Sequence, residues 1–194
     1  DNMYKKLMII YLGILAAMAP LATDMYLPSL PELQDDFGSS TALIQLTLTM
    51  TTLGMAAGQI FAGPISDLRG RKVPEYKMLF ASIAMQILGS ILLLGTFAFA
   101  DNFWLVLLFL AISVMPIPII GAVSFSLALN GQGRNAGSAS ALLGFFSMFL
   151  GALMMPVAGY IGTDTGIPMA VIMLCGFLLA MLCYWTMIQP EHQR

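Results

Sequence analysis

The stretch that decides the fold reads Gly63-Pro64-Ile65-Ser66-Asp67-Leu68-Arg69-Gly70-Arg71-Lys72, and it places a charged, glycine-broken turn between two long apolar segments. Only 9% of the residues in the chain are charged, whereas about a quarter are charged in soluble domains. The mean hydropathy is +0.87. Lipid is therefore the solvent that we expect around most of the chain.

Six apolar segments can be drawn on the two sides of this turn. Each has the roughly 20 residues that a helix needs to cross about 30 Å of hydrocarbon. Strands of an outer-membrane barrel would be half as long and would alternate in polarity, so the prediction is all-α: a polytopic membrane protein with six transmembrane helices. The predicted segments are Leu7 to Tyr26, Thr41 to Ala62, Met78 to Phe99, Trp104 to Leu129, Ala136 to Tyr160 and Pro168 to Ile188.

The basic residues predict the orientation of these segments. With six crossings, all 8 lysines and arginines fall on one side of the membrane, which the positive-inside rule makes cytoplasmic. Both termini are therefore expected in the cytoplasm. The basic residues are Lys5, Lys6, Arg69, Arg71, Lys72, Lys77, Arg134 and Arg194.

Enzyme chemistry and metal binding have few residues to use. His192 is the single histidine and lies in the polar C-terminal tail, so a metal site or a base that activates a serine within a segment is not expected. Cys175 and Cys183 lie too far apart along one helix to form a disulfide. Since no nucleotide-binding loop is present either, we expect neither an enzyme nor a cofactor.

Small residues and prolines predict where helices pack closely or bend. Gly54 and Gly58 form a G-x-x-x-G pair, which lets another helix approach closely in lipid. A second stripe of small residues in the fifth segment predicts another close contact, through Gly137, Ala141, Gly144 and Gly151. Pro116 and Pro118 interrupt the fourth segment and free backbone carbonyls, as at a gate or an ordinary kink.

Asp24 is the acidic residue with the clearest functional interpretation. It is the single acid of the first segment and is followed by apolar residues. A carboxylate at the centre of a membrane helix costs about 2.5 to 3.5 kcal/mol, and burial favours its protonated form, so it could bind and release protons. Alternatively the segment ends at Thr23, and Asp24 lies in water at the outer surface.

The charged turn also admits two interpretations. Asp67 is close enough along the chain to pair with Arg71, and Gly70 permits the turn between them. Such a pair could hold two helices in one arrangement and release them in another. It could equally be a solvated loop that only anchors the topology.

A family resemblance follows from these motifs. The run Ala22-Thr23-Asp24-Met25-Tyr26-Leu27-Pro28-Ser29-Leu30-Pro31, the pair Gly58-Gln59 and the turn from Gly63 to Lys72 resemble the first two helices of the Bcr/CflA subfamily of drug:proton antiporters, in the major facilitator superfamily. The resemblance implies proton or substrate coupling at Asp24 and Tyr26. It also implies a cytoplasmic gating loop formed by Gly63, Asp67, Gly70, Arg71 and Lys72. Leu68 stands where a basic residue is usual, which leaves the charge pairing in that loop open.

The remainder of the chain resembles a different part of the family. The fourth segment has no arginine and the fifth has no Gly-Pro-x-x-Gly-Gly pattern, although the N-terminal half of such antiporters would have both. The run from Asn135 to Gly144 is instead similar to the last two helices of the twelve-helix proteins. Residues 1–72 thus match helices one and two, and residues 73–194 resemble helices nine to twelve, with the middle six absent. An internal deletion, an incomplete record of the chain and a true six-helix half-transporter all explain this pattern, and we favour the first two.

The function implied by the resemblance is proton-coupled efflux of drugs or other small toxic compounds across the bacterial inner membrane. The expected partners are an apolar or amphipathic drug, protons and the lipid bilayer, without nucleic acid and with the proton gradient as the energy source. A second copy or the missing half would be needed if the chain is complete. Gln45, Gln59 and Gln86 could add polar contacts to a cavity or serve only helix packing. The alternatives are a non-transporting remnant or interaction module, and an uptake transporter for a small polar solute.

Overall fold

The computed structural model describes residues 7–17, 34, 38, 40–68, 75–99, 102–129, 133, 136–161 and 167–187. Every regular element in these ranges is a helix, which confirms the all-α prediction. The helices are Leu7–Ala17, α3 (Thr41–Leu68), α4 (Glu75–Phe99), α5 (Phe103–Val114), α6 (Ile117–Leu129), α7 (Ala136–Ile161) and α8 (Ile167–Met187).

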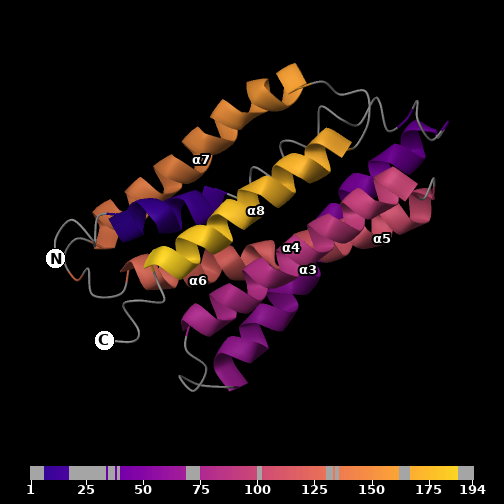
Figure 1. Cartoon of the computed structure of the whole chain (residues 1–194). Helices are drawn as coiled ribbons and strands as arrows, with labels where there is room; N and C mark the ends of the chain where they lie inside the picture. Colours follow the sequence, from indigo (N-terminus) through magenta and orange to yellow (C-terminus); the bar gives the residue numbers. More distant parts are fainter. Residues whose placement is uncertain are drawn as a thin grey trace.

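The helices run back and forth along one bundle (Figure 1). Helix Leu7–Ala17, α4 and α7 run in one direction, and α3, the α5–α6 pair and α8 run in the other. The start of the first helix and the end of α8 consequently lie at the same end of the bundle. This alternation is the one that six crossings require.

The predicted segment bounds are close to the observed helix bounds, with one exception. Helix α7 covers the predicted fifth segment, and α8 covers the sixth to within a residue at each end. Helix α3 continues to Leu68, whereas the sequence predicted a turn from Gly63 onward. A proline costs about 3 kcal/mol in a helix interior and a glycine about 1 kcal/mol, amounts that tertiary packing routinely overrides. The expected turn at Gly63 is therefore wrong for its first six residues.

Three helices in the described ranges are long and apolar enough to cross a membrane. They are Glu75–Phe99, Phe103–Leu129, which joins α5 and α6, and Ala136–Leu153 of α7. Two shorter apolar helices, Leu7–Ala17 and Ala170–Thr186, lie within the first and sixth predicted segments. Helix α3 has 28 residues but carries several threonines and glutamines, which lower its hydropathy.

Helix α4 lies at the centre of the packing, where it contacts α5, α6 and α8. Its first half joins a first apolar cluster through Leu79 and Ile83, together with helix Leu7–Ala17, α6, α7 and α8. Its second half joins a second apolar cluster through Leu93, together with α3, α5, α6 and α8. The helices therefore share two apolar cores that lie one after the other along α4.

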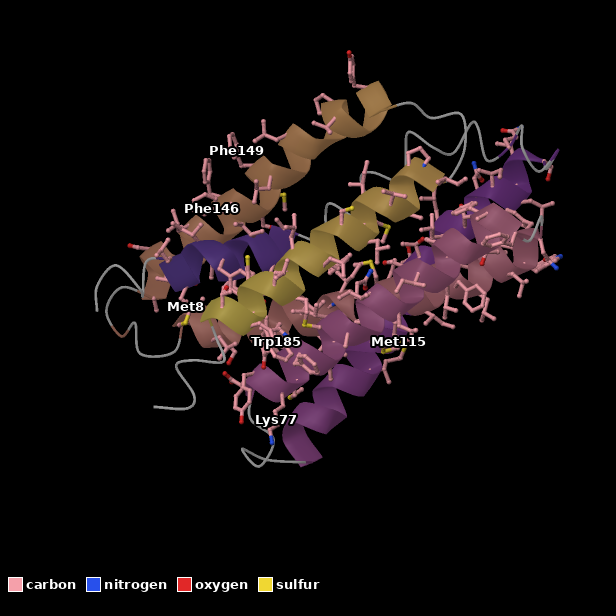
Figure 2. The ribbon with its side chains drawn as sticks, in the orientation of Figure 1. Met8, Lys77, Met115, Phe146, Phe149 and Trp185 are labelled. Carbon is pink, nitrogen blue, oxygen red and sulfur yellow. The ribbon has the colours of Figure 1, made fainter. Side chains whose placement is uncertain are left out.

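Hydrogen bonds tie four helices together at one end of the bundle. The Tyr11 hydroxyl donates to the Ala180 carbonyl at 2.8 Å, which links the first helix to α8. The Tyr184 hydroxyl donates to the Tyr76 carbonyl at 3.0 Å, which links α8 to α4. Ser126 on α6 donates to the Glu75 carboxylate on α4 at 2.6 Å. Figure 2 shows Met8, Lys77 and Trp185, from three helices, at this same end.

Helix α7 lies at the edge of the bundle and contacts α6 and α8. The Cβ atom of Phe146 lies 3.2 Å from where a Cβ on Gly13 would stand, so α7 also packs on the first helix. Gly137 and Gly144 have no neighbour within 4 Å of such a Cβ. The close contact predicted from the small residues of this helix is therefore wrong at these two positions, because they lie on an open face.

Candidate functional site

The centre of the bundle contains a break between two helices. Helix α5 begins after Asn102, whose side-chain oxygen accepts from the backbone N–H groups of Trp104 and Leu105, and it ends at Val114. Met115 and Pro116 form a turn before α6 begins at Ile117. Because a proline nitrogen has no hydrogen, it cannot donate to the carbonyl four residues earlier. The interruption predicted from the prolines of this segment is confirmed.

Three glycines hold the backbone of α5 close to its neighbours. A Cβ atom on Gly54 of α3 would lie 2.5 Å from the Ala111 carbonyl oxygen, and one on Gly58 would overlap the carbonyl oxygen of Met115. A Cβ atom on Gly89 of α4 would lie 2.7 Å from the Cα of Ser113. The close approach predicted from the G-x-x-x-G pair is thus confirmed, and its partner is the end of α5. The residues next to the helix break are therefore packed between the glycines of α3 and Gly89 of α4.

A small polar cluster lies beside this contact. It consists of Gln86 and Ser90 of α4 and Ser113 of α5, each with 0% exposure. The Gln86 side-chain nitrogen donates to the Ser113 hydroxyl at 3.2 Å, and the Ser90 and Ser113 hydroxyl oxygens lie 3.5 Å apart. The Ser90 hydroxyl donates to the Gln86 backbone carbonyl at 2.9 Å. The three side chains form one connected network, which we call the polar cluster.

One atom of this network has no partner. The side-chain oxygen Oε1 of Gln86 is buried and accepts no hydrogen bond. Leaving a buried amide group unpaired costs about 1–3 kcal/mol. Among the described residues, the Ser124 hydroxyl on α6 is the other buried side-chain group in this condition.

The polar cluster lies between the two apolar clusters along α4. Leu79 and Ile83 precede it and Leu93 follows it. It also lies near the middle of the two longest apolar spans, α4 and the α5–α6 pair. Uncharged polar side chains at that depth hydrogen-bond across helices and help to hold them together, and they can also offer hydrogen bonds to a ligand. The cluster has no ionisable member, so it can bind a ligand by hydrogen bonds but cannot itself carry a proton.

The three glutamines predicted to line a cavity differ in their exposure and in their contacts. Gln86 is enclosed in the polar cluster, as described above. Gln45 and Gln59 on α3 are exposed at the bundle surface. Of the three glutamines, Gln86 alone meets other polar side chains from a second helix in the hydrogen bonds described here.

The structure does not test the coupling and gating residues predicted from the family resemblance. Asp24 and Tyr26 lie outside the described residues, as do Gly70, Arg71 and Lys72. Gly63 and Asp67 lie in the C-terminal part of α3. Their proposed roles stay predictions.

Sequence reasoning missed Ser90, Ser113 and Gly89. Ser90 stands one helical turn after Gln86, a spacing that puts both on the same face of α4. That spacing could have identified Ser90 as a neighbour of Gln86 from the sequence. Ser113 belongs to another helix, and a single sequence gives no indication of which residue of α5 meets α4. No group of three or more His, Cys, Asp and Glu side chains that could hold a metal occurs in the described part of the chain.

Comparison of the sequence with known proteins identifies the family of this chain. Residues 12–194 match the model of the Major Facilitator Superfamily. The chain belongs to the major facilitator superfamily. Its members are transporters, which agrees with the expectation of a transport protein in a lipid bilayer that acts on small molecules.

Several curated superfamily transporters match about a third of the chain. An uncharacterised transporter of the superfamily from Bacillus subtilis, YdgK, is 49% identical over 63 residues, or 32% of this chain and 16% of the relative. A bicyclomycin resistance protein homolog from Haemophilus influenzae is 48% identical over 64 residues, or 33% and 16%. A chloramphenicol resistance protein from Pseudomonas aeruginosa is 44% identical over 55 residues, or 28% and 13%.

The matched part of the chain thus covers about a sixth of the length of these superfamily relatives. No solved structure matches the chain.

Proposed function

We propose that this chain works as a proton-coupled exporter of drugs or other small toxic compounds, of the Bcr/CflA type, in the bacterial inner membrane. The observation that carries the proposal is the superfamily match over residues 12–194, combined with relatives named for resistance to bicyclomycin, to chloramphenicol and to multiple drugs. Resistance by a membrane transporter requires outward movement of the compound. Export therefore accounts for these names better than uptake of a polar solute does.

The proposed coupling uses Asp24 as the group that carries the proton, with Tyr26 beside it. The ionised carboxylate favours binding of the drug from the cytoplasm, and protonation from the outside releases the drug. One proton that moves inward down a potential of 100 mV provides ~2.3 kcal/mol, which supports roughly fifty-fold accumulation. Gly63, Asp67, Gly70, Arg71 and Lys72 form the proposed gating region at the cytoplasmic side.

The proposed assembly contains more than one bundle of this size. Transporters with repeated bundles alternate access by rocking one bundle against the other about a central site. Residues 1–72 and 73–194 correspond, in this proposal, to the first two and the last four helices of the family fold. A second copy or the missing half would complete the cavity.

The test is proton-coupled transport by the purified chain in proteoliposomes. With a pH gradient imposed, addition of a substrate drug should collapse the gradient and move the drug. Asp24→Asn should abolish this pH-dependent transport because an amide cannot carry the proton, while the amount of inserted protein stays the same. Asp36→Asn, at an acid between the first and second predicted segments, is the matched control and should transport normally.

Each negative result has a separate meaning. Normal transport by the Asp24→Asn variant removes Asp24 from the mechanism. No transport by the inserted wild-type chain, alone or as an assembled oligomer, contradicts export and supports the alternative of a remnant without transport activity.

A further inference from the structure

We propose that Gln86 is a ligand-binding residue whose side-chain oxygen accepts a hydrogen bond from the transported compound, which must therefore carry a hydroxyl, amide or ammonium donor. This inference rests on the proposed transport function, because it names the chemical class of the compound that occupies the site.

The hydroxyl hydrogens of Ser90 and Ser113 both donate to acceptors other than the Gln86 side-chain oxygen. Ser90 donates its hydroxyl hydrogen to the Gln86 backbone carbonyl, so the contact between the two hydroxyl oxygens requires Ser113 to be the donor. Ser113 in turn accepts from the Gln86 side-chain nitrogen. Both hydroxyl hydrogens point away from Gln86 Oε1, which is left as an acceptor that no group of the cluster can satisfy. We infer that the transported compound supplies this donor.

The chemistry of this acceptor limits the class of ligand. An amide oxygen carries two lone pairs and accepts hydrogen bonds only. A cation or a neutral compound with an N–H or O–H group can satisfy it. A carboxylate or phosphate brings only acceptors and would bury them against another acceptor, which is costly in this apolar surrounding. The site therefore favours neutral or cationic donors and disfavours anions.

The packing of α5 provides a route to this acceptor. Gln86 is fully buried in the state described here, and Ser113 of α5 covers it from the other helix. Ser113 lies two residues before the turn at Met115 and Pro116. Around Ser113, α5 rests on the backbones of Gly54, Gly58 and Gly89, and glycine offers no side chain that would interlock with it. Movement of α5 about the break exposes Gln86 Oε1 at the cost of the Gln86–Ser113 hydrogen bond.

The experiment measures binding without transport. In a background with Cys175→Ser and Cys183→Ser, the variant Ser113→Cys is treated with N-ethylmaleimide in proteoliposomes that carry no proton gradient. Val114→Cys is the matched control, because Val114 is equally buried but belongs to the second apolar cluster. We expect Ser113→Cys to react at least tenfold faster than Val114→Cys. Equal rates would overturn the proposed opening.

Two organic cations of equal charge then test the ligand class. Ethidium carries aromatic amine donors, and tetraphenylphosphonium carries none. We expect saturating ethidium to slow the labelling of Ser113→Cys at least fivefold and tetraphenylphosphonium to slow it less than twofold. Equal protection by the two cations would overturn the assignment of Gln86 Oε1 as the acceptor.

Substitutions of Gln86 complete the test. Gln86→Met has a similar size and removes the acceptor, so protection by ethidium should fall below twofold. Gln86→Glu keeps an oxygen acceptor, so it should retain protection. Retained protection in the Met variant, or its loss in the Glu variant, contradicts the proposal. Since no gradient is used, a chain that shows the expected protection but fails to export contradicts the proposed function and supports this inference.

Discussion

At the scale of single residues, the glycines of this chain differ in what surrounds them. Gly89 lies against the backbone of Ser113, where a methyl group would overlap the Cα atom. Gly95, six residues later on the same helix, has nothing within 4 Å of an added Cβ. An alanine therefore fits at Gly95 but meets the backbone of α5 at Gly89.

We predict that Gly89→Ala destabilises the protein by about 1–3 kcal/mol, the usual cost of overpacking. Gly95→Ala should be neutral or stabilising by up to about 1 kcal/mol, since alanine favours the helix more than glycine does. Thermal unfolding in detergent, followed by tryptophan fluorescence, measures both. A lower melting temperature for the Gly95 variant than for the Gly89 variant would contradict the observed contact.

A second residue-scale prediction concerns the tyrosines. Tyr184→Phe removes the hydrogen bond from α8 to the Tyr76 carbonyl and should cost about 0.5–1.5 kcal/mol. Tyr160 is 93% exposed, so Tyr160→Phe is the control and should leave the melting temperature unchanged. Equal melting temperatures for the two variants would show that the hydrogen bond contributes nothing to stability.

At the scale of helices, the break between α5 and α6 depends on the position of its prolines. Pro116 lies between the two helices, where its ring prevents a hydrogen bond to the Ile112 carbonyl. Pro118 lies in the first turn of α6, where the N–H groups have no partner within the helix in any case. The first proline therefore interrupts the helix, whereas the second is compatible with the start of a new one.

We expect Pro116→Ala to join α5 and α6 into one helix, since the new N–H can donate to the Ile112 carbonyl. Hydrogen exchange, followed by mass spectrometry, should become slower across residues 112–120. Pro118→Ala should change this exchange much less. Unchanged exchange in the Pro116 variant would mean that packing, and not the proline, produces the break.

Most of the helices could be predicted from sequence because apolar runs bounded by polar residues define them. The bounds of α7 and α8 follow from this pattern almost to the residue. The end of α3 could not be predicted, because Gly63 and Pro64 look like a turn when only local propensity is considered. The pair Gly54 and Gly58 predicted a close contact without naming its partner.

The candidate site was less predictable than the helices. Gln86 was identified as a polar residue in an apolar segment, which is a local property. Its bond to Ser113 depends on how two helices are aligned across 27 positions of sequence. Small residues in α7 looked equivalent to those in α3, yet Gly137 and Gly144 face open space. Helix packing, which a single sequence does not specify, separates these cases.

At the scale of the whole molecule, the arrangement of the helices fixes which residues share an end. Lys77 lies near the start of α4, at the end where helix Leu7–Ala17 begins and α8 finishes. Asn102 lies at the opposite end, where α5 begins. The positive-inside rule assigns the end with Lys77 to the cytoplasm.

This orientation predicts the accessibility of introduced cysteines in whole cells. In the background without Cys175 and Cys183, a membrane-impermeant maleimide should label Asn102→Cys from the outside. Lys77→Cys should be labelled only after the cells are permeabilised. The reverse pattern would invert the orientation, and labelling of both from the outside would contradict the crossing of α4.

The glycines beside α5 also affect how a mutational map of this protein should be interpreted. A screen of random substitutions that abolish the proposed export would recover Gly54, Gly58 and Gly89, since any larger residue displaces α5. None of the three offers a side chain to a compound. The positions least tolerant of change would therefore be those that support one helix. Side chains that contact a transported compound would have to be sought among the more tolerant positions around it.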